Sequence, residues 1–143
     1  MPDDQDPVRT LEVRGFDATL GLRLERYDGD EVLARLTVQP SLLQPYGIVH
    51  GGVYCSVVET TASVGAALWF GERGNVVGVD NHTSFLRAVR EGELTVRATP
   101  VQRGRTQQLW SVDVRDEQDR LVATGQVRLA NLASADVLGR PAS

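Results

Sequence analysis

The chain has 143 residues, enough for one domain of ordinary size with a single core. Its formal net charge of −4 argues against a nucleic-acid-binding protein with a broad basic face. Cys55 is the only cysteine, which excludes an intramolecular disulfide and fits a reducing compartment. The stretch 1–7 is acidic and polar, unlike a secretory signal. We therefore expect a cytoplasmic protein without a nucleic-acid partner.

Two strands are predicted near the start of the chain. Leu20, Leu22 and Leu24 alternate with polar or small neighbours, and residues 32–38 repeat that period after a turn at 28–30. The pattern predicts a hairpin.

One long helix is predicted next. Pro40, Pro45 and Gly47 interrupt regular structure, and a helix can then run from Gly51 to Phe70. The apolar stretch has the length of a membrane span, but its acid, hydroxyl side chains and flanking glycines make a poor hydrocarbon-facing surface. We expect a core helix and no membrane association.

Four further strands complete the pattern, at 75–89, 94–101, 107–115 and 121–129. A single sheet can bury one apolar helix only by wrapping around it, so the sequence predicts an α+β fold in which an antiparallel sheet encloses a central helix. The domain is expected at residues 19–130, between an N-terminal tail and lead-in at 1–18 and a C-terminal tail at 131–143.

A single acid stands out in the helix. Glu59 is the only formally charged residue between Arg35 and Glu72. Burial of an ionised carboxylate without a partner is costly, so such a residue points to a site. A hydrogen-bond donor should keep it charged, and Ser63, one helical turn later, is placed to do so or to position a water molecule.

The segment 44–52, Gln-Pro-Tyr-Gly-Ile-Val-His-Gly-Gly, followed by Glu59, resembles the hotdog-fold acyl-CoA thioesterases. The likeness covers about residues 19–130 and is strongest to the PaaI-like, Arthrobacter-type 4-hydroxybenzoyl-CoA thioesterase branch. The segments 78–87, 103–106 and 110–114 occur in the order that the family shows. The resemblance implies hydrolysis of an acyl-CoA, with coenzyme A as part of the substrate and no separate cofactor. It also implies a homodimer or a dimer of dimers.

The resemblance implies that the Gly51 amide polarises the thioester carbonyl and that Glu59 acts as nucleophile or general base. A helix N-terminus offers unpaired N–H groups and a positive dipole end, and Gly51 and Gly52 let a carbonyl approach closely. The alternative is a plain helix-start turn.

Spacing adds a constraint. Gly51 and Glu59 are eight residues apart, or about 12 Å along a helix at about 1.5 Å per residue. One helix cannot bring both to one carbonyl. Two antiparallel helices across a two-fold axis can, and an isologous dimer would then contain two sites.

Other site roles depend mainly on the resemblance. Gln44 is expected to donate to the carbonyl or to hold its loop, and His50 to orient the loop or the thioester, although a structural histidine fits equally well. The resembled branch commonly has threonine where this chain has Ser63. Gly78 stands where mammalian-type relatives use a serine, which favours the Ser63 arrangement.

Arginines at strand ends are candidate ligands for the phosphates of coenzyme A. Arg87 and the cluster Arg103, Gly104, Arg105 and Thr106 are the strongest candidates, and a solvated turn is the alternative for any single arginine. A metal site built on His50, Cys55, Glu59 and His82 lacks the paired spacing of zinc sites, so we expect no metal.

Two other functions stay open. A hotdog dehydratase or hydratase would use a histidine and an acid on carbon, but the His-Gly-Gly turn argues against it. A non-catalytic acyl-CoA-binding module is possible because fold does not guarantee activity, but an acid, a glycine amide and a hydroxyl together favour catalysis.

Overall fold

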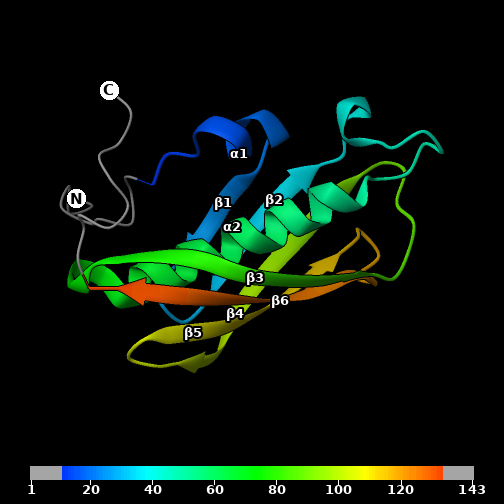
Figure 1. Cartoon of the computed structure of the whole chain (residues 1–143). Coiled ribbons are helices and arrows are strands. Elements are labelled where there is room, and N and C mark those ends of the chain that lie inside the picture. Colours follow the sequence, from blue (N-terminus) through cyan, green and yellow to red (C-terminus); the bar gives the residue numbers. More distant parts are fainter. Residues whose placement is uncertain (1–10, 134–143) are drawn as a thin grey trace.

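The computed structural model describes residues 11–133 (Figure 1). The helices are α1 (Gly15–Leu20) and α2 (Gly51–Phe70), with two short 3-10 turns, η2 (Pro40–Leu42) and η3 (Gly71–Arg73). The strands are β1 (Arg23–Tyr27), β2 (Val32–Thr37), β3 (Asn75–Phe85), β4 (Glu93–Arg103), β5 (Gln107–Arg115) and β6 (Leu121–Leu132).

The six strands form one antiparallel sheet in the order β1-β2-β4-β5-β6-β3. Helix α2 lies along one face of this sheet and contacts five of its strands, β2 to β6 (Figure 1). This confirms the predicted α+β hotdog architecture, in which the sheet wraps around one long helix.

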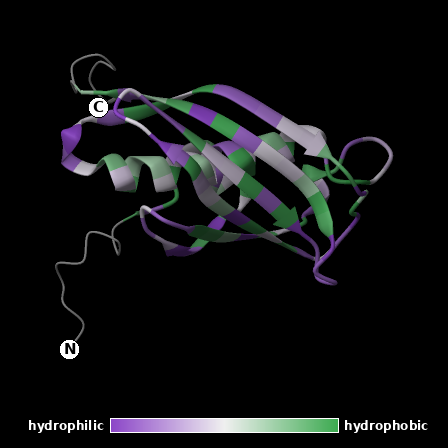
Figure 2. Ribbon diagram, turned by 90° about the horizontal axis from the view of Figure 1, so that it is seen from below, coloured by the Kyte–Doolittle hydropathy of each residue, from purple (hydrophilic) through white to green (hydrophobic). Residues whose placement is uncertain are grey.

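The core lies between α2 and the sheet. Residues on β2, β4 and β5 alternate between buried and partly exposed, and Figure 2 shows the matching alternation of hydrophobic and hydrophilic residues. Each fully buried large apolar side chain contributes about 1.5–3 kcal/mol relative to exposure. Trp110 is fully buried against Gly65 of α2, where a Cβ would lie 2.6 Å from the indole ring. By length and composition α2 could span a membrane, but half of its apolar window is buried inside the fold.

The start of the predicted hairpin is wrong. Leu20 is the last residue of α1 rather than part of a strand, and β1 begins at Arg23. Gly21 has a φ of 80° and its N–H caps the helix at the Ala18 carbonyl. Leu20 and Leu22 are nevertheless buried. The alternation of leucines therefore predicted correctly which residues are buried, but not that they belong to a strand.

Strand ends also differ from the prediction. β3 ends at Phe85 rather than Val89. β6 continues to Leu132 because Asn131 and Leu132 still pair with the start of β3. The remaining parts of the predicted tails, residues 1–10 and 134–143, lie outside the described residues.

The two edges of the sheet are unlike. β1 has five residues, an irregular register and ion pairs from Arg23 to Glu93 and from Arg26 to Glu31. β3 has eleven residues, and within residues 11–133 it pairs only with β6. Val79 on β3 is 58% exposed. β3 therefore presents a long open edge to solvent.

Candidate active site

The start of α2 leaves one backbone donor unused. The His50 side chain caps the helix, because its Nδ1 accepts from the Gly52 N–H at 2.8 Å, and the Val53 N–H donates to the His50 carbonyl. None of the hydrogen bonds among residues 11–133 uses the Gly51 N–H. The first turn of α2 also contains no acidic residue to offset the positive end of the helix dipole. The Gly51 amide can therefore bind a carbonyl oxygen.

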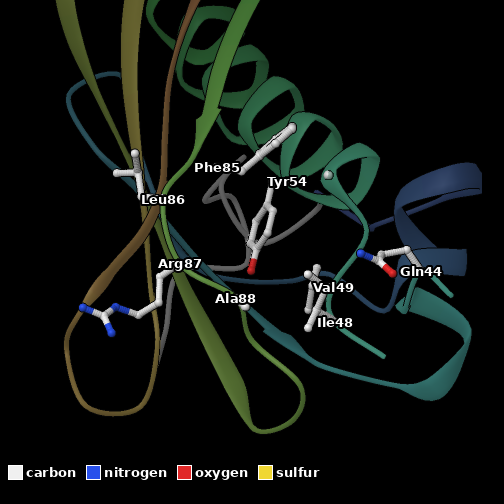
Figure 3. Close-up of a pocket in the computed structure, with 9 residues that line it drawn as sticks. Gln44, Ile48, Val49, Tyr54, Phe85, Leu86, Arg87 and Ala88 are labelled. Atoms are coloured by element: carbon white, nitrogen blue, oxygen red, sulfur yellow. The ribbon is translucent and has the colours of Figure 1, made fainter. Parts of the chain in front are cut away.

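Gly51 lines a pocket of about 330 Å³, which we call the amide pocket (Figure 3). The lining residues are Gln44, Ile48, Val49, Gly51, Tyr54, Phe85, Leu86, Arg87 and Ala88. The Gln44 side-chain oxygen accepts from the Tyr46 N–H, so its NH₂ group remains the donor that can turn toward a ligand.

A side chain at the first position of α2 would displace the ring of Phe85. A Cβ on Gly51 would lie 2.6 Å from the ring of Phe85, which stands over the helix start. Phe85 also packs on Tyr54, with ring centroids 6.0 Å apart.

Glu59 lies in a different pocket, of about 490 Å³, which we call the carboxylate pocket. Its lining residues are Leu11, Asp17, Glu59, Thr60, Ser63, Val64, Ala67, Leu68 and Val76. The predicted pair of Glu59 and Ser63 therefore shares one pocket, although no hydrogen bond joins the two side chains within the part of the chain that the structure describes.

The donor to Glu59 comes from β3 instead. Asn81 Nδ2 donates to Glu59 Oε2 at 3.1 Å and to the Cys55 carbonyl at 3.0 Å, and Thr83 Oγ1 donates to Asn81 Oδ1 at 2.7 Å. Gly78 makes room for the same carboxylate, since a Cβ there would collide with Glu59 Oε1. The sequence places Asn81 and Gly78 in a family-like segment, but only the packing of β3 on α2 reveals these contacts.

His50 and Gly52 line neither of these pockets. They line a third one, of about 490 Å³, with Phe16, Leu42 and other residues around α1 and η2. Within a single chain, His50 caps the N-terminus of α2 by accepting a hydrogen bond from the Gly52 N–H.

The candidate phosphate ligands are separated. Arg87 lines the amide pocket at the start of α2. Arg103 Nη1 donates to the Gly29 carbonyl at 2.6 Å and to Asp30 at 2.7 Å, and its guanidinium lies 5.5 Å from the ring centre of Trp69 near the end of α2. The twenty residues of α2 make these regions about 30 Å apart.

The rest of the predicted cluster forms the turn between β4 and β5. The Asn131 side chain donates to the carbonyls of Gly104 and Arg105, and the Asn131 N–H donates to the Thr106 carbonyl. The Arg105 and Thr106 side chains are exposed. The turn is therefore held through its backbone, which leaves the Arg105 guanidinium facing solvent.

Comparison with known proteins identifies the family. Residues 46–123 match the sequence model of the thioesterase superfamily. AziG of S. sahachiroi is 50% identical, with a TM-score of 0.84 over 86% of this chain and 100% of that one. The thioesterase HI1161 of Haemophilus influenzae is 34% identical, with a TM-score of 0.77 over 81% of each chain. The 1,4-dihydroxy-2-naphthoyl-CoA hydrolase of Escherichia coli K12 is 29% identical over 113 residues, 79% of this chain and 83% of the relative. The chain belongs to the thioesterase superfamily and is a hotdog-fold thioester hydrolase.

Proposed function

We propose that this enzyme hydrolyses acyl-CoA thioesters at composite sites, each formed by Glu59 of one copy and the Gly51 N–H of a second copy. The observation that carries the proposal is that the two groups line separate pockets of one chain. Eight residues on one helix hold them about 12 Å apart along its axis. Each pocket therefore has half of the groups that thioester hydrolysis needs.

The open edge of β3 supports the dimer. Contacts from β3 to α2 run in order along both elements: Gly78 meets Glu59, Asn81 meets Cys55, and Phe85 meets Gly51. If two β3 strands pair antiparallel with the two-fold axis near Asn81, Phe85 of one copy falls near Gly78 of the other. The Gly51 end of one helix then lies toward Glu59 of the other, twice per dimer.

This pairing also removes a structural liability. A long exposed edge strand offers unpaired backbone groups to other chains unless it is covered. Association of dimers into a dimer of dimers stays a prediction from the resemblance.

The chemistry follows from the two halves. The Gly51 N–H, at the positive end of the α2 dipole, donates to the thioester carbonyl oxygen and stabilises the negative charge that develops there. Gln44 adds a second donor from the same pocket. Glu59, held by Asn81, either attacks the carbonyl carbon or takes a proton from the attacking water. If Glu59 attacks, the C–S bond breaks to leave the acyl group on Glu59 as an anhydride, which a water molecule then hydrolyses to the free acid. If Glu59 acts as the base, water attacks the carbonyl carbon directly and the C–S bond breaks to give the free acid. In both cases the proton lost by the water balances the proton that the coenzyme A thiolate takes up.

Different parts of the site are proposed to bind the acyl group and the phosphates of the substrate. The carboxylate pocket has apolar walls at Val64, Ala67, Leu68 and Val76 that suit an aromatic or alkyl acyl group. A relative named for an aromatic acyl-CoA supports the aromatic choice. Arg87, at the start of α2, and the exposed Arg105, near its other end, are the proposed phosphate ligands of the composite site, with Thr106 beside Arg105. Gly52 keeps its proposed part in substrate binding only as a small residue at the helix start, because its N–H donates to His50. Nη1 of Arg103 is occupied by its contacts to Gly29 and Asp30, which makes Arg103 the weakest of the proposed phosphate ligands. No cofactor is needed, since coenzyme A belongs to the substrate.

The test is release of free thiol from benzoyl-, hydroxyphenylacetyl- and alkyl-CoA esters by the wild type and by Glu59→Ala. Turnover by the wild type that is lost in a folded Glu59→Ala variant is the expected result. Equal turnover by both proteins would remove Glu59 from the mechanism. An inert wild type would favour the acyl-CoA-binding module or the dehydratase.

A further inference from the structure

The hydroxyl of Tyr54 is buried without a partner. Tyr54 is 3% exposed, and within residues 11–133 its hydroxyl oxygen makes no hydrogen bond. A buried hydroxyl without a hydrogen bond destabilises a fold, because it has lost its contacts with water. The contact between the Tyr54 ring and Phe85 does not explain why residue 54 is a tyrosine, since a phenylalanine ring would pack equally well.

The hydroxyl lies between two polar ends of the amide pocket. Figure 3 shows Gln44 on one side of Tyr54 and Arg87 on the other, with the Tyr54 hydroxyl directed toward Ala88 and Val49. The walls between these ends are apolar. The pocket therefore offers polar groups at three successive points.

The walls of this pocket are tied together. The Val49 N–H donates to the Val89 carbonyl at 2.8 Å, and Arg90 donates to the Tyr46 carbonyl at 2.9 Å. These bonds join the loop before α2 to the segment after β3. The two walls of the pocket are therefore held together without a ligand.

The Tyr54 hydroxyl is a donor over the working pH range. Burial, and secondarily the negative charge of Asp116, raises the pKa of Tyr54 to about 12. Asp116 itself accepts from Arg120 and from the backbone N–H groups of Gln118 and Arg120. The Tyr54 proton is therefore left for a ligand.

We propose that the Tyr54 hydroxyl donates a hydrogen bond to an amide carbonyl of the pantetheine arm of coenzyme A, as the arm crosses the amide pocket from Gly51 to Arg87. The inference rests on the proposed function, which puts the thioester carbonyl at Gly51. The pantetheine arm is a narrow chain with neutral amide groups, a thioester at one end and phosphates at the other. Along the arm, the thioester, the amides and the phosphates follow one another. In the pocket, the Gly51 N–H, the Tyr54 hydroxyl and Arg87 follow in the same order.

The test begins with Tyr54→Phe, which keeps the ring and removes the oxygen. We expect KM for the best acyl-CoA ester to rise about fivefold to tenfold, the value of one neutral hydrogen bond, with kcat nearly unchanged. The melting temperature of the free protein should not fall, because the lost group had no partner. Tyr27→Phe, on β1 at the far edge of the sheet, is the control and should leave KM unchanged.

Binding measurements distinguish contacts to the pantetheine arm from contacts to the nucleotide of coenzyme A. Calorimetric titration with coenzyme A should show Tyr54→Phe weakened by the same factor, whereas adenosine 3′,5′-bisphosphate, which lacks the arm, should bind both proteins equally. An unchanged KM and coenzyme A affinity would overturn the inference, as would equal weakening toward the bisphosphate. A wild type that binds coenzyme A through Tyr54 but hydrolyses no thioester would refute the proposed function and leave this inference standing.

Discussion

The two pockets along α2 differ in what they lack. The amide pocket offers donors, the Gly51 N–H and Gln44, and none of its lining residues within 11–133 has a carboxylate. The carboxylate pocket contains Glu59 and Asp17 and lies two helical turns from the nearest unused backbone donor of the helix. Acyl transfer needs a donor for the carbonyl oxygen and a base or nucleophile at its carbon. The comparison teaches that one chain has two half-sites.

The strand β3 connects the halves. Its residues contact α2 from Glu59 at one end to Gly51 at the other, and no strand within residues 11–133 pairs with its second edge. The same strand therefore positions the acid, packs Phe85 beside Gly51 and offers the surface for a second copy.

After the loss of turnover expected in Glu59→Ala, the largest effect should come from removal of the donor in the amide pocket. Gly51→Pro deletes the N–H at the first position of α2, where proline is tolerated, and His50 already has the extended backbone that a following proline requires. We expect kcat to fall about 10²–10³-fold relative to Gly51→Ala, which keeps the N–H and places the same Cβ against Phe85. Equal rates for the two variants would show that the Gly51 amide does not act on the carbonyl.

A smaller effect should come from crowding the carboxylate pocket. In Gly78→Ala the new methyl group collides with Glu59 Oε1 and displaces the carboxylate from Asn81. We expect kcat/KM to fall about 10-fold to 100-fold, while the melting temperature hardly changes because the displaced group is the end of a flexible side chain.

The control is a glycine that touches the core. In Gly65→Ala the methyl group meets Trp110, and overpacking of this kind costs about 1–3 kcal/mol of stability. Its kcat/KM at a temperature well below unfolding should stay near the wild-type value. A Gly78→Ala enzyme with full activity would contradict the assigned position of Glu59.

The smallest effect should come from the outer face of β3. Asp80 and His82 are exposed, and an axis at Asn81 places Asp80 of each copy opposite His82 of the other. His82→Asp then sets carboxylates against one another twice, and we expect the dimer dissociation constant to rise about tenfold in sedimentation experiments. Adding Asp80→His should restore it. A dissociation constant that stays the same in both variants would refute the proposed pairing of Asp80 with His82 across the dimer axis.

Much of the fold follows from the sequence because periodicity reports one-sided burial. The strands β2, β4 and β5 each have one face on the core, so their alternation predicts them correctly. Alternation failed at Leu20, where burial comes from a short helix that Gly21 ends. The end of β6 depends on its pairing with β3, a strand distant in sequence, which no local pattern reports.

The sequence predicted the relative positions of site residues only where those residues lie on the same helix. Gly51 and Glu59 lie on one helix, and their spacing already separates them along its axis. The contacts of Asn81 and Gly78 with Glu59, and the unpaired hydroxyl of Tyr54, depend on how β3 and the loops pack on α2. The expected Ser63 donor was local in sequence, whereas the observed donor is not.

The most direct test of the composite site is to mix Glu59→Ala and Gly51→Pro, each expected to retain at most about 1% of the activity alone, under conditions in which dimers exchange subunits. A mixed dimer then contains one site with both changes and one intact site, made by Glu59 of the second variant and Gly51 of the first. Random exchange makes half of the dimers mixed, so thiol release should recover to about a quarter of the wild-type rate. If each site lies within one chain, every site in the mixture carries a change, and the activity will not recover.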